Sequence, residues 1–364
     1  MPALSLDHLA SLLDSTGVAQ HATYAVVTRE HGYCLDDNAR GLLLAVTLQR
    51  MGLHHAVAGV LFARTAAFVQ HAWNDKTGRF RNFMSFDREW LEEAGSEDSH
   101  GRALWVLGTV ARDTADPDVR RWAFELLDRA TPILPRFTSP RALAFGLLGV
   151  VAGSAATGAP DQSELRAELV SRLCGHLRDS RRLEWVWFED GLSYDNARLA
   201  QAVLAAGHQA GRPDWQAAGL DTLHWLCRVQ TSNAGRFRPV GSDGFWQRGM
   251  PRAQFDQQPI EAAATVAAAL CAWRVTGETR WFDEAARAHA WFLGENDLGI
   301  RLAVEATGGC RDGLHPDRAN ANQGAESTLA WLQAELEFTE AREAVPVPTL
   351  PSPDRMALVE EHFS

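Results

Sequence analysis

The stretch LDDNARGLLLAV at residues 35–46 shows the pattern that decides the fold, because a short polar segment opens an alanine- and leucine-rich apolar run. The tetrapeptide Asp-Asn-Ala-Arg recurs in SYDNARLAQAVLA at 193–205. Four related segments complete the set: SEDSHGRALWVLG at 96–108, TSPRALAFGLLG at 138–149, FDQQPIEAAATVAAAL at 255–270 and NQGAESTLAWLQA at 322–334. The chain therefore repeats one kind of unit six times.

The spacing of these units predicts helical hairpins. Consecutive units lie roughly 40 to 65 residues apart, which leaves room for two helices and their connections. The runs that follow the polar segments are apolar all round, as in helices packed on every side, whereas VRRWAFELLDRATPIL at 119–134 is amphipathic. We therefore expect an all-α (α/α)6 toroid over residues 1–342, with six inner and six outer helices.

The connections that precede the polar segments are rich in glycine and aromatic residues, as in NDKTGRFRNFMSFDREW at 74–90. Such segments are typical of short β-hairpins or ordered loops. Each leads into an inner helix, so all should gather at one rim, which is the expected working face. The proline-rich residues 343–364 are predicted to form a C-terminal tail.

The composition limits the partners. The chain has 46 acidic and 35 basic residues, a balance that disfavours nucleic acid. No segment reaches the roughly 20 apolar residues of a membrane span, and the N-terminus lacks a basic leader, so we expect a cytoplasmic protein that binds no membrane. Its five cysteines are scattered and predicted to be reduced. No cofactor or metal is expected, although Cys34, Asp36 and His100 are conceivable zinc ligands.

The repeat also predicts which side chains meet. In a ring of six units, the first and fourth are opposite, so the two Asp-Asn-Ala-Arg motifs should face each other across the central cavity. Cleavage of a glycoside requires one carboxylic acid and one carboxylate, and a ring of inward acids supplies both. The candidate catalytic residues are Asp36, Asp37, Asp98, Asp195, Asp256 and Glu326.

These repeats, together with strings such as HGYCLDDNAR and GSEDSHGRALW, resemble the six-hairpin glycosidase-like superfamily. The resemblance covers about residues 1–342 and implies an (α/α)6 barrel with an acid-lined sugar cleft at the ends of the inner helices. It also implies a mostly inverting mechanism. The strings further resemble those of bacterial proteins related to or fused with glycosyltransferases, which makes such an enzyme a candidate partner.

A neutral carbohydrate is the expected substrate, because the segments near the rim offer indoles for stacking and polar groups for hydroxyls. The candidate substrate-binding residues are Asn38, Arg40, Glu97, His100, Arg102, Trp185, Trp187, Asn196, Arg198, Trp246, Gln257, Gln258, His315 and Asn322.

Structural roles compete with these assignments. An aspartate at the start of a helix is often only an N-cap, as Ser139 before Pro140 evidently is. The rim tryptophans are also explained by packing, the arginines by ion pairs, and the histidines by hydrogen bonds within the fold.

We interpret the chain as a glycoside hydrolase for a neutral oligo- or polysaccharide, with a weak preference for mannosides. The first choice for the acid–base pair is Asp36 or Asp37 with Asp98. One alternative is a sugar epimerase or isomerase of the N-acylglucosamine epimerase type. It requires two of five histidines to face each other across the cavity: His21, His31, His100, His224 and His315. The other alternative is a carbohydrate-binding module without activity that works beside a glycosyltransferase.

Overall fold

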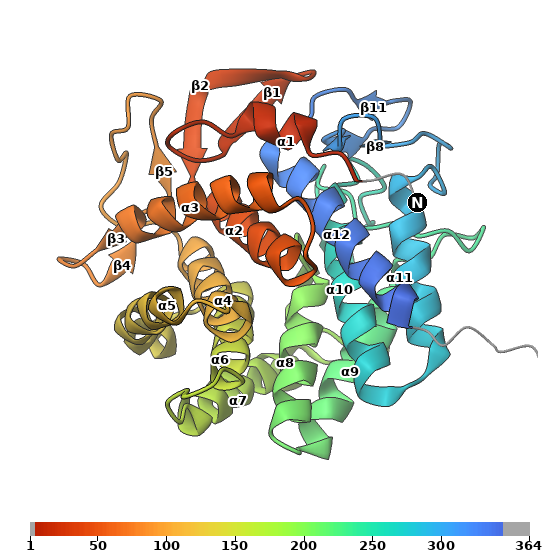
Figure 1. The fold of residues 1–364 in the computed structure, drawn as a ribbon. Helices are drawn as coiled ribbons and strands as arrows, with labels where there is room; N and C mark the ends of the chain where they lie inside the picture. The colour runs from red at the N-terminus through yellow and green to blue at the C-terminus, as the bar shows by residue number, and fades with distance from the viewer. Residues whose placement is uncertain (1–3, 345–364) are drawn as a thin grey trace, which may run out of the picture.

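The computed structural model describes residues 4–344, and within them six inner helices close a ring (Figure 1). Each inner helix packs against the next in chain order, and the last packs against the first. The predicted (α/α)6 toroid is therefore confirmed. The inner helices are α2 (Leu35–Arg50), α4 (Glu97–Asp113), α6 (Pro140–Ser154), α8 (Ala197–Gln209), α10 (Pro259–Thr276) and α12 (Ala325–Ala344).

The outer layer differs from the prediction at one position. Five long helices each pack on the inner helix that precedes them: α3 (His55–Ala72), α5 (Pro117–Ala130), α7 (Ser163–Ser180), α9 (Pro213–Val229) and α11 (Thr279–Phe292). Next to α12, the described residues supply α11 and the short α1 (Asp7–Leu12) instead of a sixth long outer helix. The predicted tail lies outside the described residues from 345 onward.

Short strands and loops connect each outer helix to the next inner helix, as predicted. The longest are β1 (Ala19–Thr23) and β2 (Val26–Cys34), which pair antiparallel and extend to β5 (Phe83–Met84). The others form two-residue ladders: β3 (Trp73–Asn74) with β4 (Arg79–Phe80), β6 (Gly191–Leu192) with β7 (Trp246–Gln247), β8 (Ala303–Val304) with β9 (Gly309–Cys310), and β10 (Gly313–Leu314) with β11 (Ala319–Asn320). A 3-10 turn over Thr131–Arg136 precedes α6.

The hydrophobic core follows the ring as two arcs. One arc lies around α4, α6 and α8, and the other around α10, α11 and α12. Val27, Phe62 and Trp273 pack against both arcs. No helix among residues 4–344 combines the length and the apolarity needed to cross a bilayer.

Glycines bring α4 and α6 into close contact. A Cβ atom on Gly108 would lie 2.0 Å from the carbonyl oxygen of Gly149, and one on Gly149 would lie 2.3 Å from that of Leu104. Backbone atoms cannot move aside as a flexible side chain can, so the two helices keep this spacing only with glycine at these positions.

We predict that Gly108→Ala lowers the free energy of unfolding by about 1 to 3 kcal/mol or more, because the added methyl group collides with α6. Gly59→Ala on the outer helix α3 is the matched control, since nothing lies within 4 Å of its added Cβ atom. It should stabilise the protein by up to about 1 kcal/mol through helix propensity. Urea unfolding of both variants measures the difference, and equal effects would contradict the close packing of α4 and α6.

Candidate active site

A layer of ion pairs joins the N-terminal ends of the inner helices. Arg102 on α4 donates from Nε to Asp36 Oδ1 at 2.8 Å and from an Nη atom to Asp195 Oδ2 at 2.9 Å. Arg40 on α2 donates to Asp37 at 3.1 Å and contacts Glu326 of α12 at 2.7 Å. Two guanidinium groups thus hold four of the predicted carboxylates together.

The two Asp-Asn-Ala-Arg motifs begin opposite helices of the ring, α2 and α8, as expected from the repeat order. Asp195 has a left-handed backbone conformation, with φ at 50°, which non-glycine residues seldom adopt. Arg198 places its Nε 3.5 Å from Asp195 Oδ1, donates to Gln201 at 2.8 Å and lies over the Trp105 ring. This arrangement turns the Asp195 carboxylate toward Arg102 at the ring axis.

The acids in this layer are not the helix N-caps. Cys34, Ser96 and Ser139 accept the capping hydrogen bonds of α2, α4 and α6, and Ser139 was predicted to do so. Asp37 instead lies in the first turn of α2, and Asp195 precedes α8. Capping therefore does not account for the buried carboxylates.

Burial controls the protonation of this layer more than like-charge repulsion does. It raises the pKa of Asp37 to about 6, against the attraction of Arg40. Burial also opposes ionisation of Asp195, but Arg102 and two further guanidinium groups outweigh it and lower the pKa. The pKa values of these two carboxyl groups are therefore shifted in opposite directions.

Glu261 in the first turn of α10 is a site residue that the sequence reasoning missed. Asn196 Nδ2 donates to its Oε2 at 2.8 Å, and Gln230 donates to the same atom at 3.4 Å. Burial raises the pKa of Glu261 to about 7, and the negative charge of Asp195 adds to the rise. The only sequence signal was a glutamate at the third position of a helix, which is also where capping glutamates occur.

Two more predicted acids lie beside this layer. Asp98 accepts from Ser139 Oγ at 2.6 Å and from the Tyr194 hydroxyl group. Its neighbour Glu97 accepts from the backbone of Thr138 and Ser139 at 2.8 Å each, and so fixes the entry into α6. Burial, together with Asp98, raises the pKa of Tyr194, so this phenol stays protonated.

Asp256 lies in the segment just before α10, and it is not part of the Arg102 bridge. Its Oδ2 accepts from Gln258 at 2.7 Å and from Ser242 at 3.2 Å, while Oδ1 is 3.7 Å from His315 Nδ1. Through Gln258 and Ser242 it borders a small pocket at the rim. Asn322, also at the rim, accepts from the backbone of Tyr24.

The rim pocket has a volume of about 200 Å³. Two carboxyl groups, Glu261 and Glu326, line it together with the Tyr194 phenol. The remaining lining residues are Ser193, Val240, Ser242, Phe245, Gln258 and Ile260. The volume of the rim pocket is below the roughly 300 Å³ of the smallest pockets for drug-sized ligands. The pocket therefore has room for a single sugar ring.

A larger cavity of about 1000 Å³ lies along the axis of the ring, on the other side of the ion pairs. Arg40, Arg102, Asp195 and Arg198 line one end, and residues from the last turns of the inner helices line the other. Arg40 lines this axial cavity and Glu326 lines the rim pocket, so their ion pair stands between the two spaces.

Several predicted binding residues are buried within the protein. Asn38, His100 and Gln257 are fully buried, and each is hydrogen-bonded to protein groups. Trp187 is also fully buried, and Trp185 is 4 % exposed. These two indoles pack with Trp225 and Trp246, and the Trp185 and Trp246 rings lie 4.8 Å apart. Their placement supports packing of the rim rather than the predicted stacking on a sugar.

The linings of the two cavities do not contain the histidine pair that the epimerase alternative required. His21, His31, His100, His224 and His315 line neither cavity in the part of the chain that the structure describes. His21 and His31 instead contact each other edge to face. Residues 4–344 also contain no group of three His, Cys, Asp or Glu side chains placed to hold a metal.

Solved structures share this architecture over nearly the whole chain. A cellobiose 2-epimerase from Bacillus thermoamylovorans superposes with a TM-score of 0.72 at 10% identity, covering 94% of this chain and 96% of its own. A sugar epimerase from a ruminal bacterium gives 0.70 at 10% identity, covering 92% and 94%. A glycosyl hydrolase family 88 protein from Bacteroides vulgatus gives 0.56 at 11% identity, covering 86% and 94%. This chain and these solved structures therefore share one fold.

At such identities the likeness establishes the fold and not the reaction. No family model matches the chain, and no curated protein matches its sequence. The solved structures of this fold named above are enzymes that act on sugars, and those with the higher TM-scores are epimerases.

We predict that Glu261 makes stability fall as the pH rises. Its pKa is about 7 in the folded protein, against 4.5 for a glutamate in water. The folded state therefore binds more protons between these pH values, and stability falls as the pH rises through them. The contribution is up to about 3 kcal/mol. Glu261→Gln should flatten the decline in melting temperature between pH 5 and 8, whereas the exposed Glu168→Gln should not. If the melting temperature of Glu261→Gln still declines as steeply, other groups cause the pH dependence.

Proposed function

We propose that this protein is a sugar epimerase or isomerase that transfers a proton at the carbon next to the carbonyl group of an open-chain sugar. The rim pocket carries the proposal, because it has room for one ring and is lined by the carboxyl groups of Glu261 and Glu326. A pocket for one sugar unit favours a reaction within that unit, after its ring has opened, over cleavage between two units. The similarity in fold to sugar epimerases supports the same choice.

The two carboxyl groups suit opposite roles. Glu326 is ion-paired with Arg40 and serves as the base that removes the proton from C2, whose electron pair moves toward the carbonyl oxygen. Glu261, whose pKa is about 7, is protonated in much of the population at neutral pH and gives that oxygen a proton. Return of a proton to the other face of C2, while Glu261 takes back the proton from O1, gives the epimer. Addition of a proton to C1, with loss of the proton from the C2 hydroxyl group, gives the ketose.

The neighbouring groups hold these two side chains in place. Asn196 and Gln230 orient the Glu261 carboxyl, while Arg40 orients Glu326 and is itself fixed by Asp37. Gln258, Ser242 and Tyr194 remain as partners for sugar hydroxyls. In this proposal two carboxyl groups transfer the protons, whereas the epimerase alternative in the sequence analysis assigned this role to a pair of histidines.

A glycoside hydrolase is the second candidate, and one observation favours it. Glu326 lines the rim pocket and is paired with Arg40, which lines the axial cavity, so a bond joining a ring in one space to a ring in the other would pass near this carboxyl group. Glu261 as acid and Glu326 as base then form the two-carboxyl pair that hydrolysis requires. Glu261 and Glu326 thus take over from the pair predicted from the sequence, which was Asp36 or Asp37 together with Asp98. The carboxyl groups of that earlier pair are engaged with Arg102, Arg40 and Tyr194.

We predict that the wild-type protein, incubated in D2O with aldoses and reducing disaccharides, exchanges the C2 hydrogen for deuterium while the chain length stays constant. Glu261→Gln and Glu326→Gln should each lower the exchange rate by about two to four orders of magnitude. The control is Glu168→Gln on the outer helix α7. NMR of the C2 proton and of the products reports the reaction.

Other outcomes separate the remaining functions. Shortened chains without exchange at C2 would reject the epimerase and support the hydrolase. Saturable binding of sugars with neither exchange nor cleavage would reject both enzymes and support a binding module.

A further inference from the structure

The axial cavity has polar residues at both ends. Three inner helices each carry two basic side chains that are ten residues apart, and the first of each pair lies in the ion-pair layer. At roughly 1.5 Å per residue, the second lies about 15 Å further along the axis. The pairs are Arg40 and Arg50 on α2, Arg102 and Arg112 on α4, and Arg198 and His208 on α8, and all six residues line the cavity. The same helices therefore form both its floor and its mouth.

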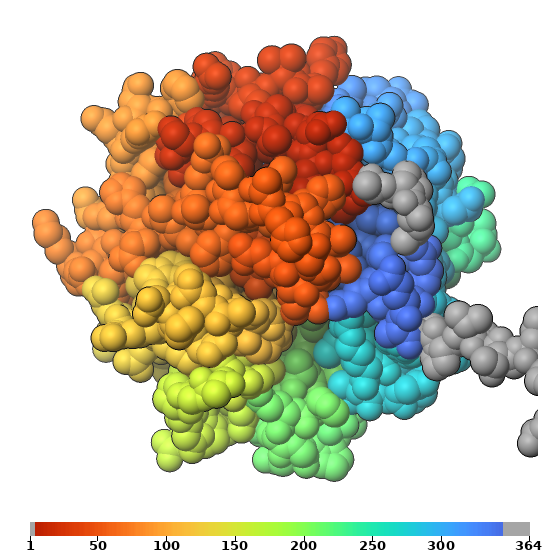
Figure 2. Space-filling view, viewed as in Figure 1, coloured from red at the N-terminus to blue at the C-terminus, as the bar shows by residue number. Residues whose placement is uncertain are grey.

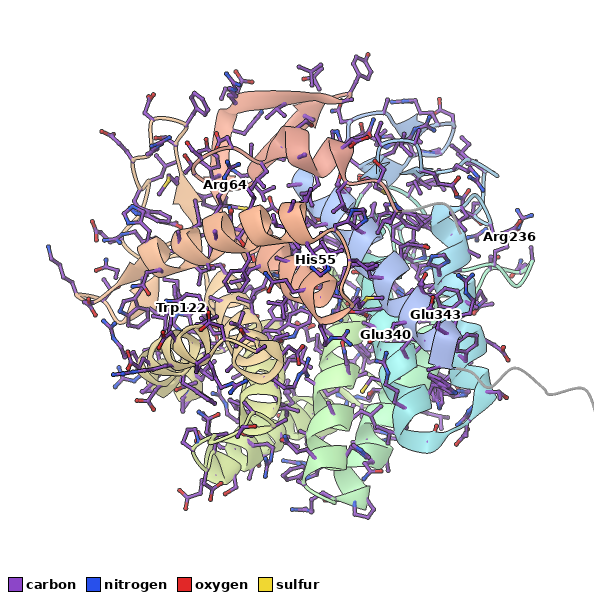
Figure 3. All side chains as sticks on the ribbon, viewed as in Figure 1. His55, Arg64, Trp122, Arg236, Glu340 and Glu343 are labelled. Atoms are coloured by element: carbon purple, nitrogen blue, oxygen red, sulfur yellow. The ribbon has the colours of Figure 1, made fainter. Side chains whose placement is uncertain are left out.

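The mouth lies at the C-terminal ends of the inner helices, opposite the rim that the sequence predicted as the working face. Figure 2 shows the surface hollowed between the segments of α2, α4, α8 and α12. Glu340, labelled in Figure 3, lies near this end of α12. A ligand can thus approach the floor without crossing the rim loops.

A middle level of neutral hydrogen-bonding groups lies between the two ends. Thr47, Thr109 and Gln333 line the cavity from three different helices, and Gln333 Nε2 donates to Thr47 Oγ1 at 3.2 Å. Gln333 Oε1 is buried without a hydrogen-bond partner. Most apolar residues of the wall are aliphatic, among them Leu43, Leu148, Ile260, Ala263, Ala267 and Leu329, and two indoles, Trp105 and Trp273, also line the cavity.

The floor offers unused hydrogen-bonding capacity. Asp195 is 1 % exposed and Arg198 is 6 % exposed, and both line the cavity. Asp195 Oδ1 and Arg198 Nε form an ion pair with each other at 3.5 Å, but neither atom makes a hydrogen bond. Buried polar atoms are nearly always hydrogen-bonded, so both atoms have capacity left for a ligand hydroxyl group or water.

The charges at the mouth do not favour an anion. Arg50 donates to Glu340 at 3.0 Å, and Arg112 donates to Asp113 at 2.6 Å, so both guanidinium groups are already neutralised. The carbonyl ends of the helix dipoles also repel negative charge. An apolar chain fits no better, since it would leave the floor and the middle level without partners.

We propose that the axial cavity binds a neutral oligosaccharide, which enters at the C-terminal mouth and directs its terminal ring toward the rim pocket. Hydroxyl groups meet the three polar levels, and the C–H faces of the rings pack on the aliphatic wall. The cavity has several times the volume of the rim pocket, so it holds a short chain. This inference rests on the proposed function for the ring that reacts, but the binding itself does not depend on turnover.

The test uses Ala267→Phe, which fills the aliphatic wall from α10, where Ala267 is 3 % exposed. Calorimetry with manno- and cello-oligosaccharides of increasing length should show that wild-type affinity rises at least tenfold from the monosaccharide to the tetrasaccharide. Ala267→Phe should remove this gain. Ala217→Phe on the exposed side of α9 is the matched control and should retain it.

A second variant guards against misfolding of the first. Gln333→Met keeps the side-chain length but removes the hydrogen bonds of the middle level, so it should weaken tetrasaccharide binding at least fivefold with little change in melting temperature. Wild-type affinity that does not depend on chain length, or a length dependence that both variants retain, overturns the proposal. If the wild type converts no sugar but binds oligosaccharides, and Ala267→Phe loses that binding, the proposed function fails while the axial site stands.

Discussion

The bridge from Arg102 to Asp36 and Asp195 is the interaction on which the site depends. It links α4 to the starts of α2 and α8 at the centre of the ring, with the Arg102 side chain only 3 % exposed. Carboxylates at such depth are tolerable only when they are paired, because an unpaired buried charge costs several kcal/mol. Arg102 thus lets carboxylates be held in the interior, where burial, together with the charge of Asp195, raises the pKa of Glu261.

The repeat pattern was sufficient to predict the fold and to place part of the ion-pair layer. A polar segment before an apolar run predicts an inner helix wherever it occurs, and six such units leave few arrangements besides a closed ring. The duplicated Asp-Asn-Ala-Arg motif also placed Asp37 and Asp195 at opposite helices. The sixth outer position was beyond this reasoning, because the short α1 next to α12 lies before the first repeat in the sequence.

The remaining features depend on packing that a sequence does not specify. Glu261 follows a proline at a helix start, where a capping role explains it equally well, and only burial distinguishes the two. The tryptophans of the rim segments were expected to face a ligand, but large aromatic side chains gain more from packing together. The repeat order predicted a central cavity but not the residues that line its length, because those residues, spaced three or four apart, look like ordinary core positions of an inner helix.

A crystal structure of the protein with a bound reducing oligosaccharide tests the central claim most directly, namely that one ring reacts between Glu261 and Glu326 while the rest of the chain lies along the axis. The account predicts a sugar ring in the rim pocket within hydrogen-bond distance of both carboxyl groups, with further rings beyond the Arg40–Glu326 ion pair. Sugar bound only on the outer face of the rim, with both carboxyl groups covered by protein, would contradict it.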